Sequence, residues 1–279
     1  MSNSSFANST RQPWNRPEER PFVELLELGR QGYAEKHWHS HVLLGLNGVE
    51  WDGERGRKYN SARLLKPDGT NGPRYDKLHL VPFGEYPPFR EQFPFLANFT
   101  PDPTNPGCEP GDDLVRFDLP VVRRGADGKQ VPKLYQFGVL ICYEDTEPVL
   151  ARRFNQWAAD GKPADFVVNM SLDSWFDGSE QHEQHLTLAR FRAVEARRSV
   201  LRAVNMGITA VIDPDGRVLQ TVDFEWADSK KKTGTVVTDV PIDTRGSVYA
   251  AVGDWVPLLC WAGIAAGLVQ AWRVRKHHA

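Results

Sequence analysis

The feature that most constrains the fold is a near-continuous apolar run, Phe137–Ile141, that ends at Cys142 and runs directly into the carboxylates of Glu144 and Asp145. An apolar run of this length, followed by Pro148, is typical of a strand buried on both faces of a sheet. Catalytic groups in open α/β sheets usually lie where a strand ends. Cys142 is therefore a candidate nucleophile, and the alternative is a core cysteine that only packs.

Extended and helical patterns alternate along the rest of the chain. Leu186, Ala189, Ala193 and Ala196 recur at helical spacing. Pro-Asp-Gly turns follow two extended runs, at residues 67–69 and 214–216. We expect helices over 21–31 and 183–198, and strands over 42–46, 62–65, 137–141, 165–169, 200–205 and 209–212. This alternation predicts an α/β layered domain, which we place at residues 21–250 after a polar segment, 1–20.

Composition and charge narrow the classes of function. A formal net charge of -2 gives no basic surface for binding nucleic acid. Cys108, Cys142 and Cys260 are too few and too scattered for a disulfide framework, and their spacing matches no metal site. We therefore expect no nucleic-acid partner, no metal and no cofactor. The first twenty residues also lack the pattern of a signal peptide.

The C-terminal segment differs from the rest of the chain. Residues 256–271 carry no formal charge, Trp255 and Trp272 flank them, and Arg273-Val274-Arg275-Lys276 follows. This pattern predicts a membrane helix over 255–272 with interfacial aromatics, and a basic tail, 273–279, on the cytoplasmic side. A buried core helix and an amphipathic tail are the alternatives, because the run is at the short end of the roughly 17 to 25 residues that span a bilayer.

A second chemical segment surrounds Lys77. Taken alone, Lys77 is a solvated surface charge. Beside a cysteine, a lysine favours the thiolate and can donate to a developing oxyanion. Glu85 and Glu144 supply carboxylates that can transfer protons or orient Lys77.

Several ordered motifs carry a family resemblance. They are Tyr75-Asp76-Lys77, His79-Leu80-Val81-Pro82-Phe83-Gly84-Glu85-Tyr86, Cys142-Tyr143-Glu144, Asn169-Met170-Ser171 and Trp175-Phe176. With these motifs the chain resembles the nitrilase (carbon-nitrogen hydrolase) superfamily, and within it the apolipoprotein N-acyltransferase branch. The likeness covers most of Val42 to Tyr249.

The resemblance implies an αββα sandwich and a Glu-Lys-Cys triad. Cys142 is the implied nucleophile and Lys77 the oxyanion-stabilising lysine. Glu85 and Glu144 match further acidic positions of the acyltransferase branch, and Tyr143 matches the aromatic neighbour of the nucleophile. With Trp175 and Phe176, Tyr143 is a candidate to bind substrate.

The implied reaction passes an acyl chain through a thioester of Cys142. The donor is a membrane phospholipid, and the acceptor is the α-amine of the diacylglyceryl-cysteine at a lipoprotein N-terminus. The implied location is the bacterial inner membrane, with the catalytic domain on the periplasmic side. A final membrane helix whose basic end faces the cytoplasm fits this location.

The sequence also departs from the branch. No apolar strand ending in the expected base glutamate precedes Lys77, and Glu18, in a polar Arg16-Pro17-Glu18-Glu19 context, is the one Pro-Glu upstream. The N-terminal membrane bundle of the branch is also absent. We therefore expect a chain that begins inside the catalytic domain, from a truncated gene model or a split gene, and that is catalytically silent. Glu18 is kept as a possible base.

Two hypotheses from different classes of function follow, an enzyme and a non-catalytic protein. One is an acyltransferase or its C-terminal part, with a nitrilase-type amidase as the alternative within the same chemistry. The other is an inactive, membrane-tethered remnant that lacks the base and binds a lipid, a lipoprotein or a partner subunit.

Overall fold

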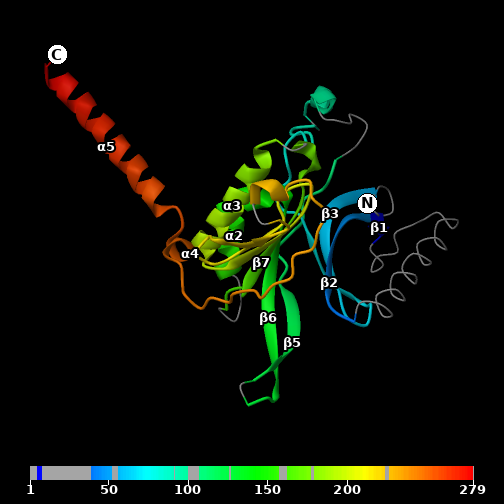
Figure 1. Ribbon diagram of the computed structural model, residues 1–279. Helices are drawn as coiled ribbons and strands as arrows, with labels where there is room; N and C mark the ends of the chain where they lie inside the picture. Colours follow the sequence, from blue (N-terminus) through cyan, green and yellow to red (C-terminus); the bar gives the residue numbers. More distant parts are fainter. Residues whose placement is uncertain are drawn as a thin grey trace.

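The computed structural model describes residues 5–7, 39–51, 56–90, 92–99, 107–125, 127–156, 162–176, 179–223 and 226–278. Two sheets lie against each other, with helices on the far side of one of them (Figure 1). Ala62, Leu64 and Tyr75 of the first sheet join Val139 and Leu140 of the second in one buried apolar cluster. The core therefore lies between the sheets, as a layered α/β domain requires.

The first sheet has the order β1-β2-β3-β4. Its strands are β1 (Ser5–Ala7), β2 (Val42–Trp51), β3 (Gly56–Leu65) and β4 (Asn71–Asp76). β2, β3 and β4 are antiparallel, whereas β1 pairs in parallel with β2. The sequence pattern predicts β2 and β3 but not β1, because three residues are too short to show a period.

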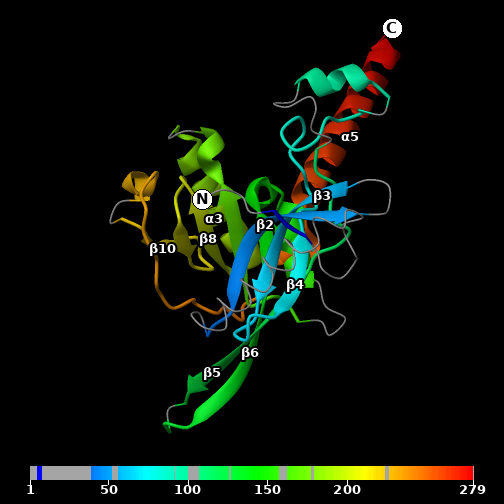
Figure 2. The same ribbon diagram turned by 90° about the vertical axis from the view of Figure 1, so that its right-hand side faces the viewer.

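The second sheet has the order β10-β9-β8-β7-β6-β5. Its strands are β5 (Phe117–Arg124), β6 (Gln130–Ile141), β7 (Phe166–Leu172), β8 (Ser199–Asn205), β9 (Ala210–Ile212) and β10 (Val218–Thr221). β6, β7 and β8 are parallel, and the other pairs are antiparallel. Phe137 to Ile141 are all buried in β6, which confirms the predicted central strand. The β5–β6 hairpin extends below the sandwich (Figures 1 and 2).

Helices α2 (Pro148–Gln156) and α3 (Gln181–Ala196) pack beside the second sheet (Figure 1), and α4 (Val248–Val252) contacts these two helices. In α3, Leu186, Ala189 and Ala193 are buried at helical spacing, as predicted. Arg197, in the left-handed region with φ 53°, ends this helix. The helix expected over 21–31 lies outside the described residues. The described residues also include four short 3₁₀ helices: η1 (Pro94–Phe99), η2 (Cys142–Thr146), η3 (Asp173–Phe176) and η4 (Trp226–Ser229).

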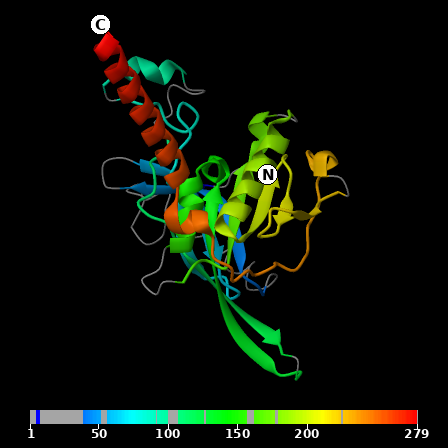
Figure 3. The same cartoon turned by 90° about the vertical axis from the view of Figure 1, so that its left-hand side faces the viewer.

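The C-terminal helix α5 (Trp255–His278) projects away from the domain (Figures 1 and 3). Its part Trp255–Lys276 is 22 residues long and apolar enough to cross a membrane, and its most apolar stretch is not buried in the protein. The alternative of a core helix therefore does not fit, because a core helix would bury this surface. The helix also continues past Trp272 into the basic tail.

Candidate active site

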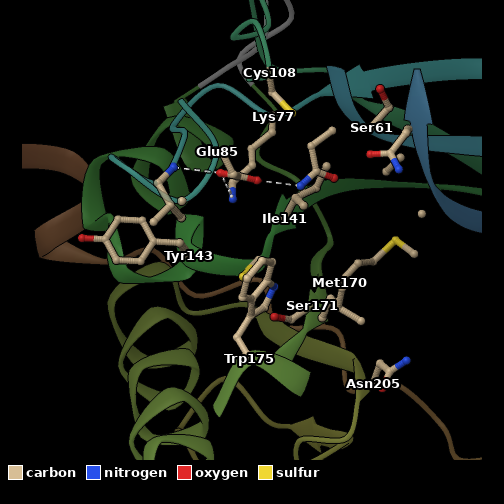
Figure 4. Close-up of a pocket in the computed structure, with 18 of the residues that line it drawn as sticks. Ser61, Lys77, Glu85, Cys108, Ile141, Tyr143, Met170, Ser171, Trp175 and Asn205 are labelled. Carbon is tan, nitrogen blue, oxygen red and sulfur yellow. Dashed lines mark hydrogen bonds and ion pairs between the residues drawn. The ribbon is translucent and has the colours of Figure 1, made fainter. Parts of the chain in front are cut away.

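A cavity of about 860 Å³ lies where β6 ends, against the segment that follows β4. It is lined by most of the residues that the sequence singled out, namely Lys77, Glu85, Cys142, Tyr143, Trp175 and Phe176. Figure 4 shows Lys77, Glu85, Tyr143, Ser171 and Trp175 around this space. The fold thus brings together two segments that are 65 residues apart in the chain, from Lys77 to Cys142.

Cys142 is the first residue of η2, directly after β6. Its φ of 52° lies in the left-handed region, a backbone conformation that residues other than glycine rarely adopt. The Asn169 side-chain amide donates to the Cys142 carbonyl oxygen at 3.3 Å and so holds this conformation. Burial raises the pKa of the Cys142 thiol, against the lowering effects of the Lys77 charge and of hydrogen bonds from Ser171 and the Tyr143 backbone.

Lys77 follows β4 and is buried, with 1% of its surface exposed. Its Nζ lies 2.7 Å from Oε2 of Glu85, which also accepts a hydrogen bond from the Val81 amide at 2.8 Å. Oε1 of Glu85 accepts from the Asn60 side chain at 2.8 Å. The interpretation of Lys77 as a surface charge is therefore wrong. A buried lysine needs a paired anion, and Glu85 supplies it.

Glu144 is buried and does not line the cavity. Its Oε1 accepts hydrogen bonds from the Tyr75 hydroxyl (2.7 Å) and from the amides of Leu78 (2.8 Å) and His79 (3.1 Å). Its Oε2 accepts from the Ile141 amide at 2.7 Å. Burial raises the pKa of Glu144, although these donors act in the opposite direction. The Glu144 carboxylate thus links Ile141, the residue before Cys142, to Leu78, the residue after Lys77.

The aromatic candidates lie at the mouth of the cavity. Trp175 is 69% exposed, and Tyr143 and Phe176 are each more than a third exposed. The Tyr143 ring stacks on His79 with centroids 5.8 Å apart. Large exposed aromatics beside a cavity supply apolar contact area for a ligand.

Other candidates are placed differently. Cys108 also lines the cavity, and burial raises the pKa of its thiol. Glu18 lies outside the described residues. Within the described ranges, no group of three or more His, Cys, Asp or Glu side chains has a metal-binding arrangement. The sequence did not reveal a buried polar cluster behind Cys142 that contains Asp145, Asp173, His185 and Arg202.

The solved structures to which this chain is similar include an amidase of the nitrilase superfamily. An amidase from Nesterenkonia is 18% identical, with a TM-score of 0.43 over 73% of this chain and 65% of that one. A carbon-nitrogen hydrolase from Helicobacter pylori is 16% identical, with a TM-score of 0.47 over 75% of this chain and 67% of that one.

Curated relatives are more similar in sequence. Apolipoprotein N-acyltransferase 2 of Treponema denticola is 31% identical over 73% of this chain, and the enzymes named apolipoprotein N-acyltransferase of Geobacter metallireducens and Bdellovibrio bacteriovorus are 32% and 36% identical over 85% and 75% of it. The matched parts make up 35%, 40% and 35% of those relatives. The chain thus corresponds to well under half of each. The sequence profile of the carbon-nitrogen hydrolase family matches residues 28–250, which is most of the chain. The protein therefore belongs to the carbon-nitrogen hydrolase family.

Proposed function

We propose that this chain carries the acyl-transfer site of an apolipoprotein N-acyltransferase. The observation that carries the proposal is that the Cys142 thiol shares one cavity with the buried Lys77–Glu85 ion pair. The names of the relatives support the choice of acyl transfer over other reactions of the family.

In the first half of the reaction, the Cys142 thiol loses its proton to a base, and the thiolate sulfur attacks the carbonyl carbon of a phospholipid ester. The ammonium of Lys77 and the backbone N–H of Tyr143 share the cavity with the sulfur, both lower the pKa of its thiol, and they stabilise the oxyanion of the tetrahedral intermediate. When the intermediate collapses, the carbon–oxygen bond breaks. The lysophospholipid alcohol leaves with the proton, and a thioester remains on Cys142.

In the second half, the α-amine of a diacylglyceryl-cysteine attacks the thioester carbonyl. An amide bond forms, the carbon–sulfur bond breaks, and the proton released by the amine returns to the sulfur. Lys77 stabilises this second oxyanion as well. Trp175, Phe176 and Tyr143 contact the acyl chains at the mouth of the cavity.

The two carboxylates have different roles in this proposal. Glu85 orients and neutralises Lys77, while Glu144 holds the backbone on which Lys77 and Cys142 are placed. The thiol proton needs an acceptor. Of the described residues, Glu85 is the carboxylate that lines the cavity, and Glu18 is the candidate outside them.

The proposed location is the bacterial inner membrane, with the catalytic domain on the periplasmic side. Two features support it. η1 and α5 extend from the same end of the domain, at the top of Figures 2 and 3. The segment around η1 exposes Phe89, Phe93, Phe95 and Phe99, and α5 ends in arginine and lysine, which favour the cytoplasmic side. The domain that precedes α5 then lies on the periplasmic side of the membrane. On that side, both α5 and the segment around η1 contact lipid.

The experiment is an acylation assay with the full chain in detergent. Incubation with phosphatidylethanolamine should add one acyl mass to the peptide that contains Cys142 in any version of the chain that retains a base, and a synthetic diacylglyceryl-cysteine peptide should then remove it. Cys142→Ala should abolish the adduct, whereas Cys108→Ala, the matched change at the second thiol of the cavity, should retain it. Glu18→Gln and Glu85→Gln identify the base.

The outcomes separate the alternatives. An adduct on Cys108 would refute the assignment of the nucleophile. Release of ammonia from small amides without lipid acylation would identify an amidase. A chain that binds lipid but forms no adduct, even when supplied with upstream sequence, would be an inactive remnant.

A further inference from the structure

Four charged side chains form a closed cluster directly behind Cys142. Asp145 comes from η2, Asp173 from η3, His185 from α3 and Arg202 from β8, and each is at most 4% exposed. His185 Nε2 lies 2.7 Å from Asp145 Oδ1, and His185 Nδ1 lies 3.1 Å from both oxygens of Asp173. Arg202 contacts the same two carboxylates, at 2.8 Å and 3.3 Å.

The charges of this cluster balance only when His185 is protonated. Two carboxylates face one guanidinium, so a neutral imidazole would leave one negative charge buried without compensation, which is costly. Each ring nitrogen of His185 faces a carboxylate oxygen, and both nitrogens can donate only in the imidazolium form. Burial lowers the pKa of His185, but the hydrogen bonds to Asp145 and Asp173 outweigh it and raise the pKa to about 9. His182, from the same helix, has its Nδ1 3.8 Å from Asp173.

Two polar side chains connect the cluster to Cys142. The Ser171 hydroxyl donates its single proton to Asp173 Oδ1, and turning that proton toward the Cys142 sulfur lowers the thiol pKa. Asn169 Oδ1 accepts from Arg202 Nη1 at 3.0 Å, and Asn169 Nδ2 donates to the Cys142 carbonyl oxygen. One connection reaches the sulfur and the other the left-handed backbone, which needs such support to persist.

We propose that Asp145, Asp173, His185 and Arg202 are positioning residues for Cys142, and that the charge on His185 sets how readily the thiol ionises. The proposal rests on the proposed role of Cys142 as nucleophile. Among the charged groups around the thiol, the ammonium of Lys77 favours the thiolate and the carboxylate of Asp173 opposes it. Lys58 and Glu85 also line the cavity. The imidazolium of His185 offsets the effect of the Asp173 carboxylate on the thiol, because His185 and Arg202 are cations in direct contact with that carboxylate.

Two single substitutions test this with opposite signs. His185→Gln removes the cation, so the net charge behind the sulfur becomes more negative and the thiol pKa rises. Asp173→Asn removes the opposing anion while leaving an oxygen to accept from Ser171, so the thiol pKa falls. A purely structural role would shift both variants in the same direction or neither.

The measurement is the rate of iodoacetamide alkylation of Cys142 as a function of pH, read by peptide mass spectrometry on the full chain in detergent. We expect the alkylation rate at about pH 7, where His185 carries its charge, to fall about tenfold in His185→Gln and to rise about tenfold in Asp173→Asn. Arg190→Gln, a charge change on the same helix whose side chain donates to the Gly216 carbonyl, is the control and should leave the profile unchanged.

If His185→Gln folds poorly, the double variant Asp145→Asn/His185→Gln restores the charge balance and should return the alkylation rate at about pH 7 to that of the wild type. Equal profiles for wild type and His185→Gln, or parallel shifts in the two single variants, would overturn the proposal. The alkylation assay contains no acyl donor. Its result therefore does not depend on whether lipid acylation occurs in the earlier experiment.

Discussion

The ammonium of Lys77 and the carboxylate of Glu85 lie 2.7 Å apart, and the lysine is almost completely withdrawn from water. An ion pair in this setting is held together because breaking it leaves an uncompensated buried charge. Glu85 also accepts from Val81 and Asn60, so its position is fixed by three donors. The ammonium is therefore preorganised in the cavity that it shares with Cys142 before any substrate arrives.

Lys77→Met should lower the rate of Cys142 acylation by about 2 to 4 kcal/mol of transition-state stabilisation, the range for losing one oxyanion donor. Methionine has a similar length, so the fold should be retained. Single-turnover acylation, followed by mass spectrometry, measures the effect. Lys129→Met, at a highly exposed lysine of the β5–β6 hairpin, is the control. An unchanged rate in Lys77→Met would show that the buried ammonium does not act on the reacting carbonyl.

Glu144→Gln should destabilise the site without removing any group that lines the cavity. In glutamine an NH2 group, which is a donor, takes the place of one acceptor oxygen of the carboxylate. This donor then faces other donors, either the Ile141 amide or the three groups that donate to Oε1. Leaving such buried groups unpaired costs about 1 to 3 kcal/mol. Unfolding midpoints and acylation rates of the variant should both fall.

Tyr75→Phe is the milder comparison for the same carboxylate. It removes one donor and keeps the three amides, so it should cost about 1 kcal/mol. If Glu144→Gln instead kept full stability and lost all acylation, Glu144 would be a proton carrier and not a positioning residue.

The sequence predicted that Cys142 stands at the end of a buried strand, because that signal is local. An apolar strand and the residue that follows it are contiguous, so the end of β6 at Cys142 follows from the pattern of Phe137 to Ile141. The chemistry of a lysine and carboxylates beside a cysteine singled out Lys77 and Glu85, the resemblance implied their roles, and the structure adds that the two side chains contact each other. The sequence placed Glu144 beside the nucleophile, but it could not show that backbone amides occupy its oxygens.

The cluster behind Cys142 was missed because its members come from four elements, and Asp145 and Arg202 are 57 residues apart. Two local signals were present. Arg202 interrupts the otherwise apolar start of β8, and His185 precedes Leu186 on the buried face of α3. A charged residue in a buried strand needs a partner, but the sequence cannot say which carboxylates supply it.

The stability of the protein should depend on pH through His185. Its pKa in the folded protein, about 9, is above the ordinary value of 6.5. The resulting stabilisation is fully present below about pH 6.5 and is lost as the pH rises to 9, with a total of about 3 kcal/mol. The difference in unfolding midpoint between the wild type and His185→Gln should therefore shrink over this interval. A constant difference would mean that His185 is neutral in the folded protein.

Deletion of the chain after Asp254 should convert a protein that requires detergent into one that does not. α5 exposes Leu258, Trp261 and Leu268 and buries none of its apolar stretch in the domain, so its removal costs the core nothing. A helix of this kind satisfies its own backbone hydrogen bonds and places its side chains in lipid. Circular dichroism should show the domain still folded, and sedimentation with vesicles should show loss of membrane binding.

The matched control replaces Leu258 and Leu268 by alanine, which keeps the helix and weakens its membrane binding in proportion to the apolar area removed. If the deletion unfolds the domain, or if the full chain stays in solution without detergent, α5 is not a membrane anchor.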